Sequence, residues 1–182
     1  TDIPPSGLLE VCSTIGNADF KKCIVFHSLS KRSNLPGLRS GFVAGDADFI
    51  ASFLKYRTYH GCSMSMAVQK ASELAWADEE HVIANRALYA QKFKQAAEIL
   101  GDRMNTDDPG AGLYLWAKTP KRCDTFSREL FEATGVTVLP GQYLGREVDG
   151  INPGAGFVRM ALVAEPDTCR EALERIQTFI TR

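Results

Sequence analysis

Short apolar runs alternate with longer amphipathic stretches along this chain, a pattern typical of α/β proteins. Residues 23–27 form an almost unbroken apolar run between two lysines and a serine-rich loop. Such a run predicts a strand buried on both faces, as in a parallel sheet covered by helices. A second short run at 41–44 predicts another strand, and Asp46 is placed to cap a helix whose apolar residues begin at Phe49.

Two further helices are predicted before the middle of the chain. Ser63 or Ser65 could cap a helix that runs to about Ala77. Asp78 then opens the longest helical pattern, and Gly101 occupies the position where a terminating glycine is expected. A helix of about 22 residues is about 33 Å long, which is enough to connect two domains.

The remaining residues predict a smaller region in which strands and helices are mixed. The predicted elements are strands at 113–117, 136–139 and 157–163, a helix at 125–134 that ends at Gly135, and a last helix whose capping box is Thr168 with Glu171. Together the elements predict the end of an α/β domain in residues 1–77, a connecting helix in 78–101, and a small α+β domain in 102–182.

The composition is that of an ordinary globular chain. Of the 182 residues, 45% are hydrophobic and 24% are charged, and the formal net charge is -1. Without a basic excess we expect no nucleic-acid partner, and with no long apolar run we expect no membrane span. The five cysteines contain no Cys-x-x-Cys pair and the three histidines are isolated, which favours a reducing cytoplasm and predicts no metal site.

The densest chemical signal lies in residues 28–41, directly after the first predicted strand. Lys31 follows the carboxyl end of that strand, where ligands bind in open α/β sheets. Ser28 and Ser30 precede it, and Arg39 follows beside glycines. An amine can capture an aldehyde, and hydroxyls with a guanidinium are the donors that a phosphate needs, which is the combination that pyridoxal phosphate requires. From the spacing alone, Lys31 and Arg39 could instead be solvated loop charges.

Residues 28–41 resemble the cofactor-attachment motif of the class I/II pyridoxal-phosphate-dependent aminotransferases, whose pattern is S-x-S-K, then a glycine, then R-x-G. Ser40 departs from that pattern, because the family usually has an apolar residue there. Three further segments, at 109–116, 135–141 and 156–162, resemble the family in the same order. The resemblance implies fold type I, with the C-terminal part of the cofactor-binding large domain (a mixed, mostly parallel sheet with helices) followed by the small α+β domain.

The resemblance also implies a role for each matching residue. Lys31 would hold pyridoxal 5'-phosphate covalently and transfer the substrate proton, Ser28, Ser30 and Arg39 would bind the phosphate, and Arg159 would bind the substrate α-carboxylate. The implied substrates are an amino acid and a 2-oxo acid, and the implied assembly is a homodimer. For Arg159 a structural ion pair inside the protein is the alternative.

Within the family, residues 26–46 and 56–61 are most similar to the bacterial N-succinyldiaminopimelate aminotransferases. This similarity implies amino transfer between N-succinyl-2,6-diaminopimelate and glutamate or 2-oxoglutarate in lysine biosynthesis. Another amino-acid specificity remains open, as does a different class of function, the aminotransferase-like effector domain of a transcription regulator. Asp2 and Asp19 do not lie in the D-x-x-Y setting in which the family holds the cofactor ring. We therefore expect the C-terminal half of a longer enzyme, inactive alone.

Several other polar residues could belong to the site or could be ordinary surface. Arg32, Lys55 and Arg57 could anchor a second substrate carboxylate, although surface charge is the simpler interpretation. A loop that in relatives approaches the neighbouring subunit's site contains Tyr59, His60 and Ser63, and simple packing or solvation explains that loop equally well.

Overall fold

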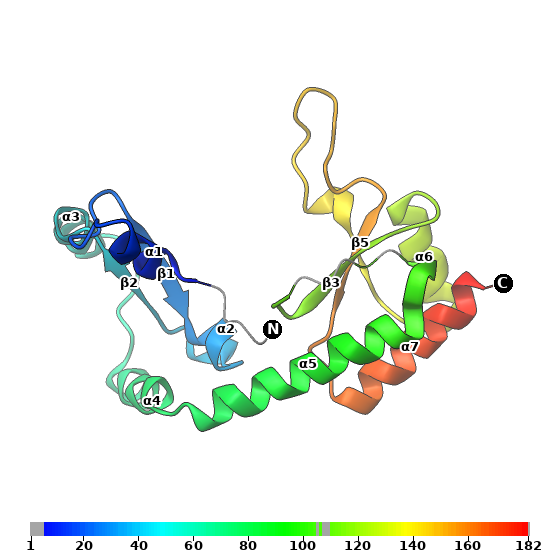
Figure 1. Ribbon diagram of the computed structural model, residues 1–182, viewed down its shortest axis with the longest axis horizontal. Helices are drawn as coiled ribbons and strands as arrows, with labels where there is room; N and C mark the ends of the chain where they lie inside the picture. The colour runs from blue at the N-terminus through cyan, green and yellow to red at the C-terminus, as the bar shows by residue number, and fades with distance from the viewer. Residues whose placement is uncertain (1–5, 105, 107–109, 182) are drawn as a thin grey trace. The chain divides into compact units, whose positions relative to one another are not determined.

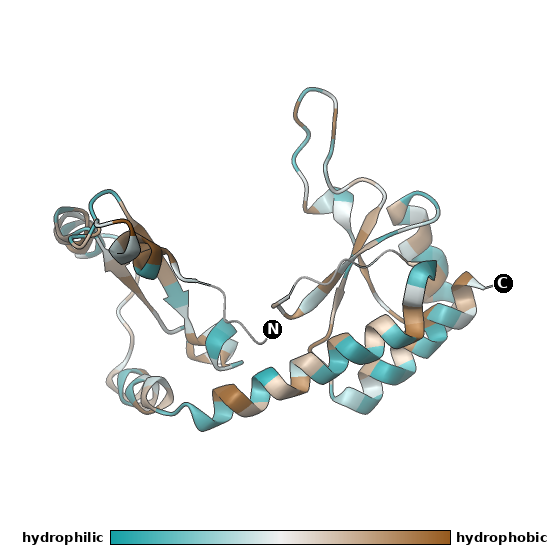
Figure 2. Ribbon diagram, in the orientation of Figure 1, coloured by the Kyte–Doolittle hydropathy of each residue, from teal (hydrophilic) through white to brown (hydrophobic). Residues whose placement is uncertain are grey.

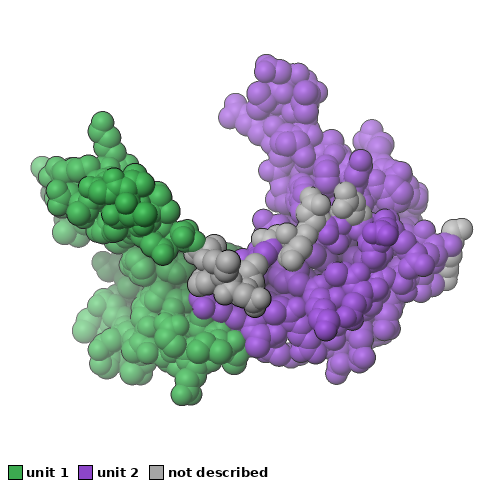
Figure 3. Space-filling model, viewed as in Figure 1, with its two compact units in different colours: residues 1–85 green, residues 86–182 purple. Residues whose placement is uncertain are grey.

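The computed structural model describes residues 6–104, 106 and 110–181. Two compact units divide the chain, Thr1–Asn85 and Arg86–Arg182, coloured green and purple in Figure 3. Asp2 and the first residue of the family-like segment 109–116 lie outside the described residues.

The first unit contains a two-stranded sheet with short helices around it (Figure 1). Its elements are α1 (Leu8–Thr14), β1 (Ile24–Ser28), α2 (Leu29–Arg32), the 3-10 turn η1 (Pro36–Leu38), β2 (Gly41–Gly45), α3 (Ala47–Arg57), α4 (Met66–Ala77) and the first turns of α5 (Glu80–Leu100). The predicted strands and helices are confirmed within a few residues, whereas α1 was not predicted.

The α/β class is confirmed, and β1 and β2 pair antiparallel, which the expected mixed, mostly parallel sheet permits for one pair of strands. Residues 29–40 join the two strands through a four-residue helix and a 3-10 turn. Parallel neighbours need a crossover long enough to return along the sheet, and this connection reverses the chain within a short distance. The burial expected on both faces of β1 is also absent, since Phe26 is 68% exposed.

Side-chain caps fix where the helices of the first unit begin. Asp46 caps α3 as predicted, because its carboxylate accepts hydrogen bonds from the main-chain N–H groups of Asp48 (2.9 Å) and Phe49 (3.4 Å). It also accepts from the Lys22 N–H, outside the helix, at 2.8 Å. These main-chain donors, that of Lys22 above all, hold the pKa of Asp46 below its ordinary value. Ser65 caps α4, accepting from the Val68 N–H at 3.3 Å, which resolves the predicted choice between Ser63 and Ser65.

The second unit is a three-stranded antiparallel sheet with helices packed on it. Its elements after α5 are η2 (Gly101–Arg103), β3 (Tyr114–Lys118), α6 (Cys123–Thr134), β4 (Leu139–Pro140), η3 (Gly141–Tyr143), β5 (Phe157–Ala161) and α7 (Pro166–Ile180). The strand order is β3-β5-β4, so β5 is central. Gly135 ends α6 in the left-handed conformation with φ 72°, as predicted.

The last helix starts two residues earlier than its predicted capping box. α7 begins at Pro166, and no side chain caps it at Glu165. A proline suits the first helical position because its fixed φ matches the helix and its missing N–H would have no partner there. The buried face of this helix contains Cys169, Leu173 and Ile176. Apolar and polar residues alternate along α5 and α7 (Figure 2).

Most of the buried apolar side chains of the described residues belong to the second unit. Its core is formed by the end of α5, the inner faces of β3 and β5, and the apolar faces of α6 and α7; Phe126, Leu130 and Val158 are completely buried. In the described part of the first unit, the buried apolar side chains are Cys12, Leu29 and Val82. Over the described residues, we find no helix with the length and apolarity needed to cross a bilayer.

Candidate active site

Lys31 lies in α2, directly after the end of β1. The helix starts at this point because the Ser28 hydroxyl accepts a hydrogen bond from the Ser30 N–H at 3.1 Å, the usual bond of an N-cap serine. The same hydroxyl donates to the Ser40 carbonyl at 3.3 Å, which ties the start of α2 to the start of β2. Leu29, which lies between Ser28 and Ser30 in the sequence, is completely buried. Lys31 is therefore presented from a short helix anchored at its first residues.

The two cationic groups of the predicted cofactor site, Lys31 and Arg39, lie at the two ends of the loop between β1 and β2. Among the residues that the structure describes, the Lys31 amine has neither a hydrogen-bond nor an ion-pair partner. Arg39 adopts the left-handed conformation with φ 50°, and its guanidinium donates to the Pro36 carbonyl at 3.2 Å. Left-handed backbone is rare for a residue with a side chain and is held by surrounding structure where it occurs. Among the described residues, the other donors of the Arg39 guanidinium have no partner, so they are open to a ligand.

Gly41, the glycine of the R-x-G motif, is required for a steric reason. Gly41 lies opposite Ser28 in the antiparallel pair. A Cβ at Gly41 would come within 2.4 Å of the His27 carbonyl oxygen, so any side chain here would force the strands apart. The glycine therefore keeps the lysine-bearing and arginine-bearing ends of the loop close together.

Ser40, the residue that departs from the family pattern, has a hydrogen-bond partner in α4. The Ser40 hydroxyl shares a 2.7 Å hydrogen bond with the hydroxyl of Ser72, and both side chains are buried. A buried hydroxyl needs such a partner, and Ser72 supplies it from 32 positions away in the sequence. Ser72 was not singled out from the sequence, because nothing local marks a serine on a helix as the partner of a distant loop.

Arg32 has neither of the roles considered for it from the sequence. Its side chain is only 10% exposed. Its guanidinium donates to the main-chain carbonyls of Ala75 (2.8 Å) and Trp76 (3.3 Å) at the end of α4. It is thus a buried structural group and is not displayed toward solvent.

Arg159 occupies the middle of the central strand of the second unit. It lies opposite Trp116 in β3 and Leu139 in β4, and its guanidinium carbon is 5.7 Å from the ring centroid of Tyr114. Within 4 Å of its guanidinium we find no carboxylate in the described parts of the chain, so the structural ion pair considered as an alternative is not present there. Its neighbours Val158 and Met160 point into the core, so Arg159 points to the opposite face of the sheet.

The other polar candidates of the first unit form only local contacts. Arg57 donates to the Cys62 carbonyl at 3.0 Å, and His60 stacks on Tyr56 with ring centroids 4.3 Å apart. The side chains of Lys55, Tyr59 and Ser63 are exposed. These contacts are consistent with an ordinary surface loop and identify no bound group.

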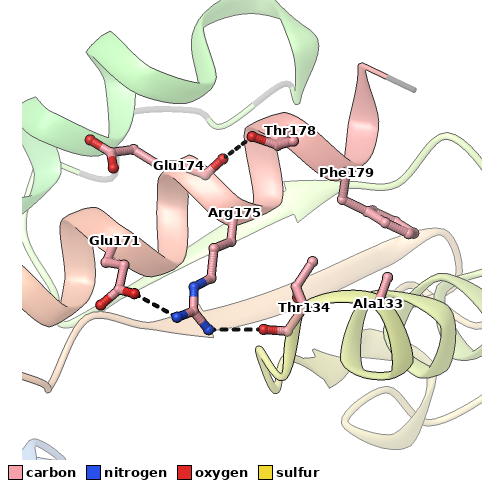
Figure 4. Close-up of a pocket in the computed structure, with 7 residues that line it drawn as sticks. All are labelled: Ala133, Thr134, Glu171, Glu174, Arg175, Thr178 and Phe179. Carbon is pink, nitrogen blue, oxygen red and sulfur yellow. Dashed lines mark hydrogen bonds and ion pairs between the residues drawn. The ribbon is translucent and has the colours of Figure 1, made fainter.

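Two cavities of the structure lie away from the predicted site residues. One, of about 460 Å³, lies between α6 and α7, where Arg175 donates to the Thr134 carbonyl at 3.0 Å and pairs with Glu171 (Figure 4). The other, of about 600 Å³, is lined by Ser33, Leu35, Leu74, Ala75, Asp78, His81 and Asn85. Neither is lined by a residue predicted to bind cofactor or substrate.

The donor set around α2 fits pyridoxal 5'-phosphate. Lys31 offers an amine for the aldehyde, and the Arg39 guanidinium with the Ser30 hydroxyl offers hydrogen-bond donors for the phosphate. Ser28 fits less directly, because its hydroxyl already donates to the Ser40 carbonyl. A phosphate would therefore have to displace that bond or be bound without the Ser28 hydroxyl as donor.

The comparisons with known proteins identify the family of this chain. A profile of the family described as Aminotransferase class I and II matches residues 8–176. A crystal structure of an aminotransferase from Neisseria meningitidis Z2491 superposes with a TM-score of 0.89 at 48% identity and covers 96% of this chain and 44% of its own. A probable N-succinyldiaminopimelate aminotransferase from Thermus thermophilus superposes with a TM-score of 0.76 at 28% identity, covering 88% of this chain and 43% of its own.

A curated relative, LL-diaminopimelate aminotransferase from Maridesulfovibrio salexigens, is 33% identical over 180 residues, which are 96% of this chain and 43% of the relative. The fold and the lysine loop define a protein of the pyridoxal-phosphate-dependent transferase type. The chain belongs to the class I and II aminotransferase family, whose members depend on pyridoxal 5'-phosphate. It spans less than half the length of these relatives.

Proposed function

We propose that this chain supplies the lysine and the carboxylate-binding arginine of an enzyme that transfers an amino group between an amino acid and a 2-oxo acid. The observation that carries the proposal is the Lys31 amine just after the end of β1, without a partner among the described residues and in the same loop as the Arg39 guanidinium. The names of the relatives support an enzyme over the effector domain of a transcription regulator.

Lys31 would fix the cofactor through its amine and would then move a proton at the substrate Cα. When bound, the cofactor supplies an electron sink that stabilises negative charge at that carbon. A lysine amine held beside that carbon could act as a base, so Lys31 could provide both attachment and proton transfer.

Arg39 with Ser30, and Ser28 after a change of its hydrogen bond, would bind the phosphate. A guanidinium and hydroxyls can give several charge-assisted hydrogen bonds to one phosphate group. Arg159 would bind the substrate α-carboxylate with two parallel N–H···O bonds. Lysine cannot form that paired geometry, so Arg159→Lys is expected to raise KM for the amino acid despite the unchanged charge.

The substrate we propose is N-succinyl-2,6-diaminopimelate, with glutamate and 2-oxoglutarate as the second pair, in lysine biosynthesis. Support comes from the resemblance of residues 26–46 and from the names of two relatives, which share the diaminopimelate skeleton and differ in the succinyl group. Turnover of succinylated diaminopimelate against LL-diaminopimelate and aspartate tests this choice, and a preference for either unsuccinylated substrate would refute it.

We further propose that residues 1–77 belong to the cofactor-binding large domain and that 102–182 form the small domain. Residues 78–101 would form the helix that connects these two domains. The family match over 8–176 supports this arrangement. The enzyme is proposed to be a cytoplasmic homodimer, with this chain alone inactive. Light scattering on the full-length protein measures the assembly, and a monomer that retains full activity would contradict the homodimer.

Reduction with borohydride, followed by peptide mass spectrometry of the full-length protein, tests the role of Lys31. The cofactor is expected on the peptide that contains Lys31, and Lys31→Ala is expected to abolish both this adduct and amino transfer. Near-normal turnover of the alanine variant would show that the assignment is wrong.

A further inference from the structure

Arg32 and Lys31 are neighbours in α2 but lie in different environments. The Lys31 amine has no partner among the described residues, whereas the Arg32 side chain is 10% exposed and both terminal nitrogens of its guanidinium donate hydrogen bonds. The acceptors of the Arg32 guanidinium are the Ser33 hydroxyl (3.3 Å), the carbonyls of Ala75 (2.8 Å), Trp76 (3.3 Å) and Asp78 (3.4 Å), and the Glu79 carboxylate. One buried side chain therefore joins α2 to the end of α4 and the residues before α5.

The main-chain carbonyls at the end of α4 require hydrogen-bond donors from outside the helix. The last carbonyls of a helix have no partner inside it, and the partial negative charge there favours a cation. α4 carries no basic residue in its last turn. Arg32 supplies the missing cation and donors from a different element.

The contact is reinforced by a cluster of rings that we call the Trp76 cluster: His27, Phe42 and Trp76. The Arg32 guanidinium carbon lies 5.2 Å from the Trp76 ring centroid. Trp76 in turn packs against His27 of β1 at 5.4 Å and Phe42 of β2 at 5.0 Å. Arg32 is thereby held between the end of α4 and the strands on either side of the lysine loop.

We propose that Arg32 is a positioning residue for Lys31, an inference that rests on the proposed function of Lys31. A four-residue helix is too short to hold its own shape, so the direction of Lys31 depends on what anchors α2. Leu29 anchors the first residue by complete burial, and Arg32 anchors the last through its five acceptors. Leu29 and Arg32 therefore determine the direction in which the Lys31 amine points.

The ion pair with Glu79 extends this control to the start of α5. The Glu79 carbonyl accepts the first helical hydrogen bonds of α5, from the N–H groups of Val82 (3.1 Å) and Ile83 (3.0 Å). A shift of that first turn therefore changes the anchor of α2. A lysine at position 32 would be a single point charge without the planar fork, so it could not reach the same acceptors together.

The test uses the full-length protein freed of cofactor, with the variants Arg32→Lys, Arg32→Gln and Glu79→Gln. Two quantities are measured: the rate at which pyridoxal 5'-phosphate forms a borohydride-reducible bond at Lys31, and the affinity for pyridoxamine 5'-phosphate, which has no aldehyde and binds without that bond. We expect attachment to slow on the order of tenfold in the Arg32 variants and less in Glu79→Gln, since small misplacements of a reacting group are costly. The affinity for pyridoxamine 5'-phosphate should be unchanged.

Lys70→Gln is the matched control, because Lys70 is an exposed lysine on α4 that pairs only with Glu73 among the described residues. It should leave both quantities unchanged. Attachment at the wild-type rate in both Arg32 variants would overturn the proposal, as would a parallel loss of pyridoxamine 5'-phosphate affinity, which marks a general structural role. If Lys31→Ala still forms the reducible bond, the proposed function itself fails; if it loses the bond while the Arg32 variants keep the rate, only the positioning role fails.

Discussion

The guanidinium of Arg159 lies over the ring of Tyr114, with its central carbon 5.7 Å from the ring centroid. The two residues come from the adjacent antiparallel strands β5 and β3, in which Arg159 is opposite Trp116 and Tyr114 is opposite Ala161. A ring face attracts a cation without neutralising it. Tyr114 can therefore orient Arg159 while leaving its charge available to a carboxylate.

Replacing Tyr114 tests this orientation in the full-length enzyme. Tyr114→Leu removes the ring and is expected to raise KM for the amino acid about two- to fivefold with little change in kcat, the equivalent of one exposed cation–π contact. Tyr114→Phe keeps the ring and serves as the control, with a KM near that of the wild type. Equal KM values for the leucine and phenylalanine variants would show that the ring does not orient Arg159.

The hydrogen bond between Ser40 and Ser72 predicts a non-additive pair of mutations. Ser72→Ala leaves the Ser40 hydroxyl buried without this partner, and an unsatisfied buried hydroxyl costs about 1–3 kcal/mol. In the double alanine variant both hydroxyls are gone, so it is expected to be destabilised by less than the sum of the two single variants. Urea unfolding of the four proteins measures the coupling, and strict additivity would mean that the bond contributes nothing.

The capping carboxylate of Asp46 predicts a pH-dependent contribution to stability. Its pKa is lowered in the folded protein, chiefly by the hydrogen bond from the Lys22 N–H. The contribution is therefore fully present above the unfolded-state pKa of about 3.9 and is lost as the pH falls through the lower folded-state value. Asp46→Asn should lower the melting temperature at pH 7.

Repeating this comparison from about pH 5 down to about pH 2 should make the difference between wild type and Asp46→Asn shrink. Asp48→Asn is the control, because the side chain of Asp48 is 89% exposed and its ion pair with Lys21 is on the surface. If the melting-temperature difference between wild type and Asp46→Asn stays constant over this pH range, the charge of the Asp46 carboxylate is not its cause.

The uneven distribution of core residues predicts that the two units differ in stability when separated. Residues 86–182 contain the whole core cluster, including Phe126, Leu130 and Val158, whereas the buried apolar side chains described in residues 1–85 are Cys12, Leu29 and Val82. The fragment 86–182 is expected to unfold cooperatively in urea, and the fragment 1–85 to show no cooperative transition. Circular dichroism of each fragment measures this, and a cooperative transition in 1–85 would contradict the prediction.

Local sequence signals predicted the helix ends that depend on one or two residues. Asp46 and Gly135 are examples, because a cap or a left-handed terminating residue acts on its own turn. The capping box at Thr168 was wrong because Pro166, also a local signal, starts the helix earlier. The helix α1 was missed, since its seven residues contain too little periodicity to stand out.

The partners of the candidate site could not be predicted in the same way. Lys31 and Arg39 were predicted as candidates because they share one loop with a recognisable spacing. Ser72 lies 32 positions from Ser40, and the acceptors of Arg32 beyond its own loop lie 43 to 47 positions away. No periodicity relates such positions, so only the packing of α4 against the lysine loop brings them together.

The sequence by itself determined the family, the lysine loop and the α/β alternation, because motifs and caps are properties of neighbouring residues. Tertiary structure alone decided that Ser72 is the partner of Ser40, that Arg32 is buried and that Arg159 lies over Tyr114. Burial and contacts between distant residues depend on which segments remove a side chain from water, and that choice is made by the free energy of the whole packed unit.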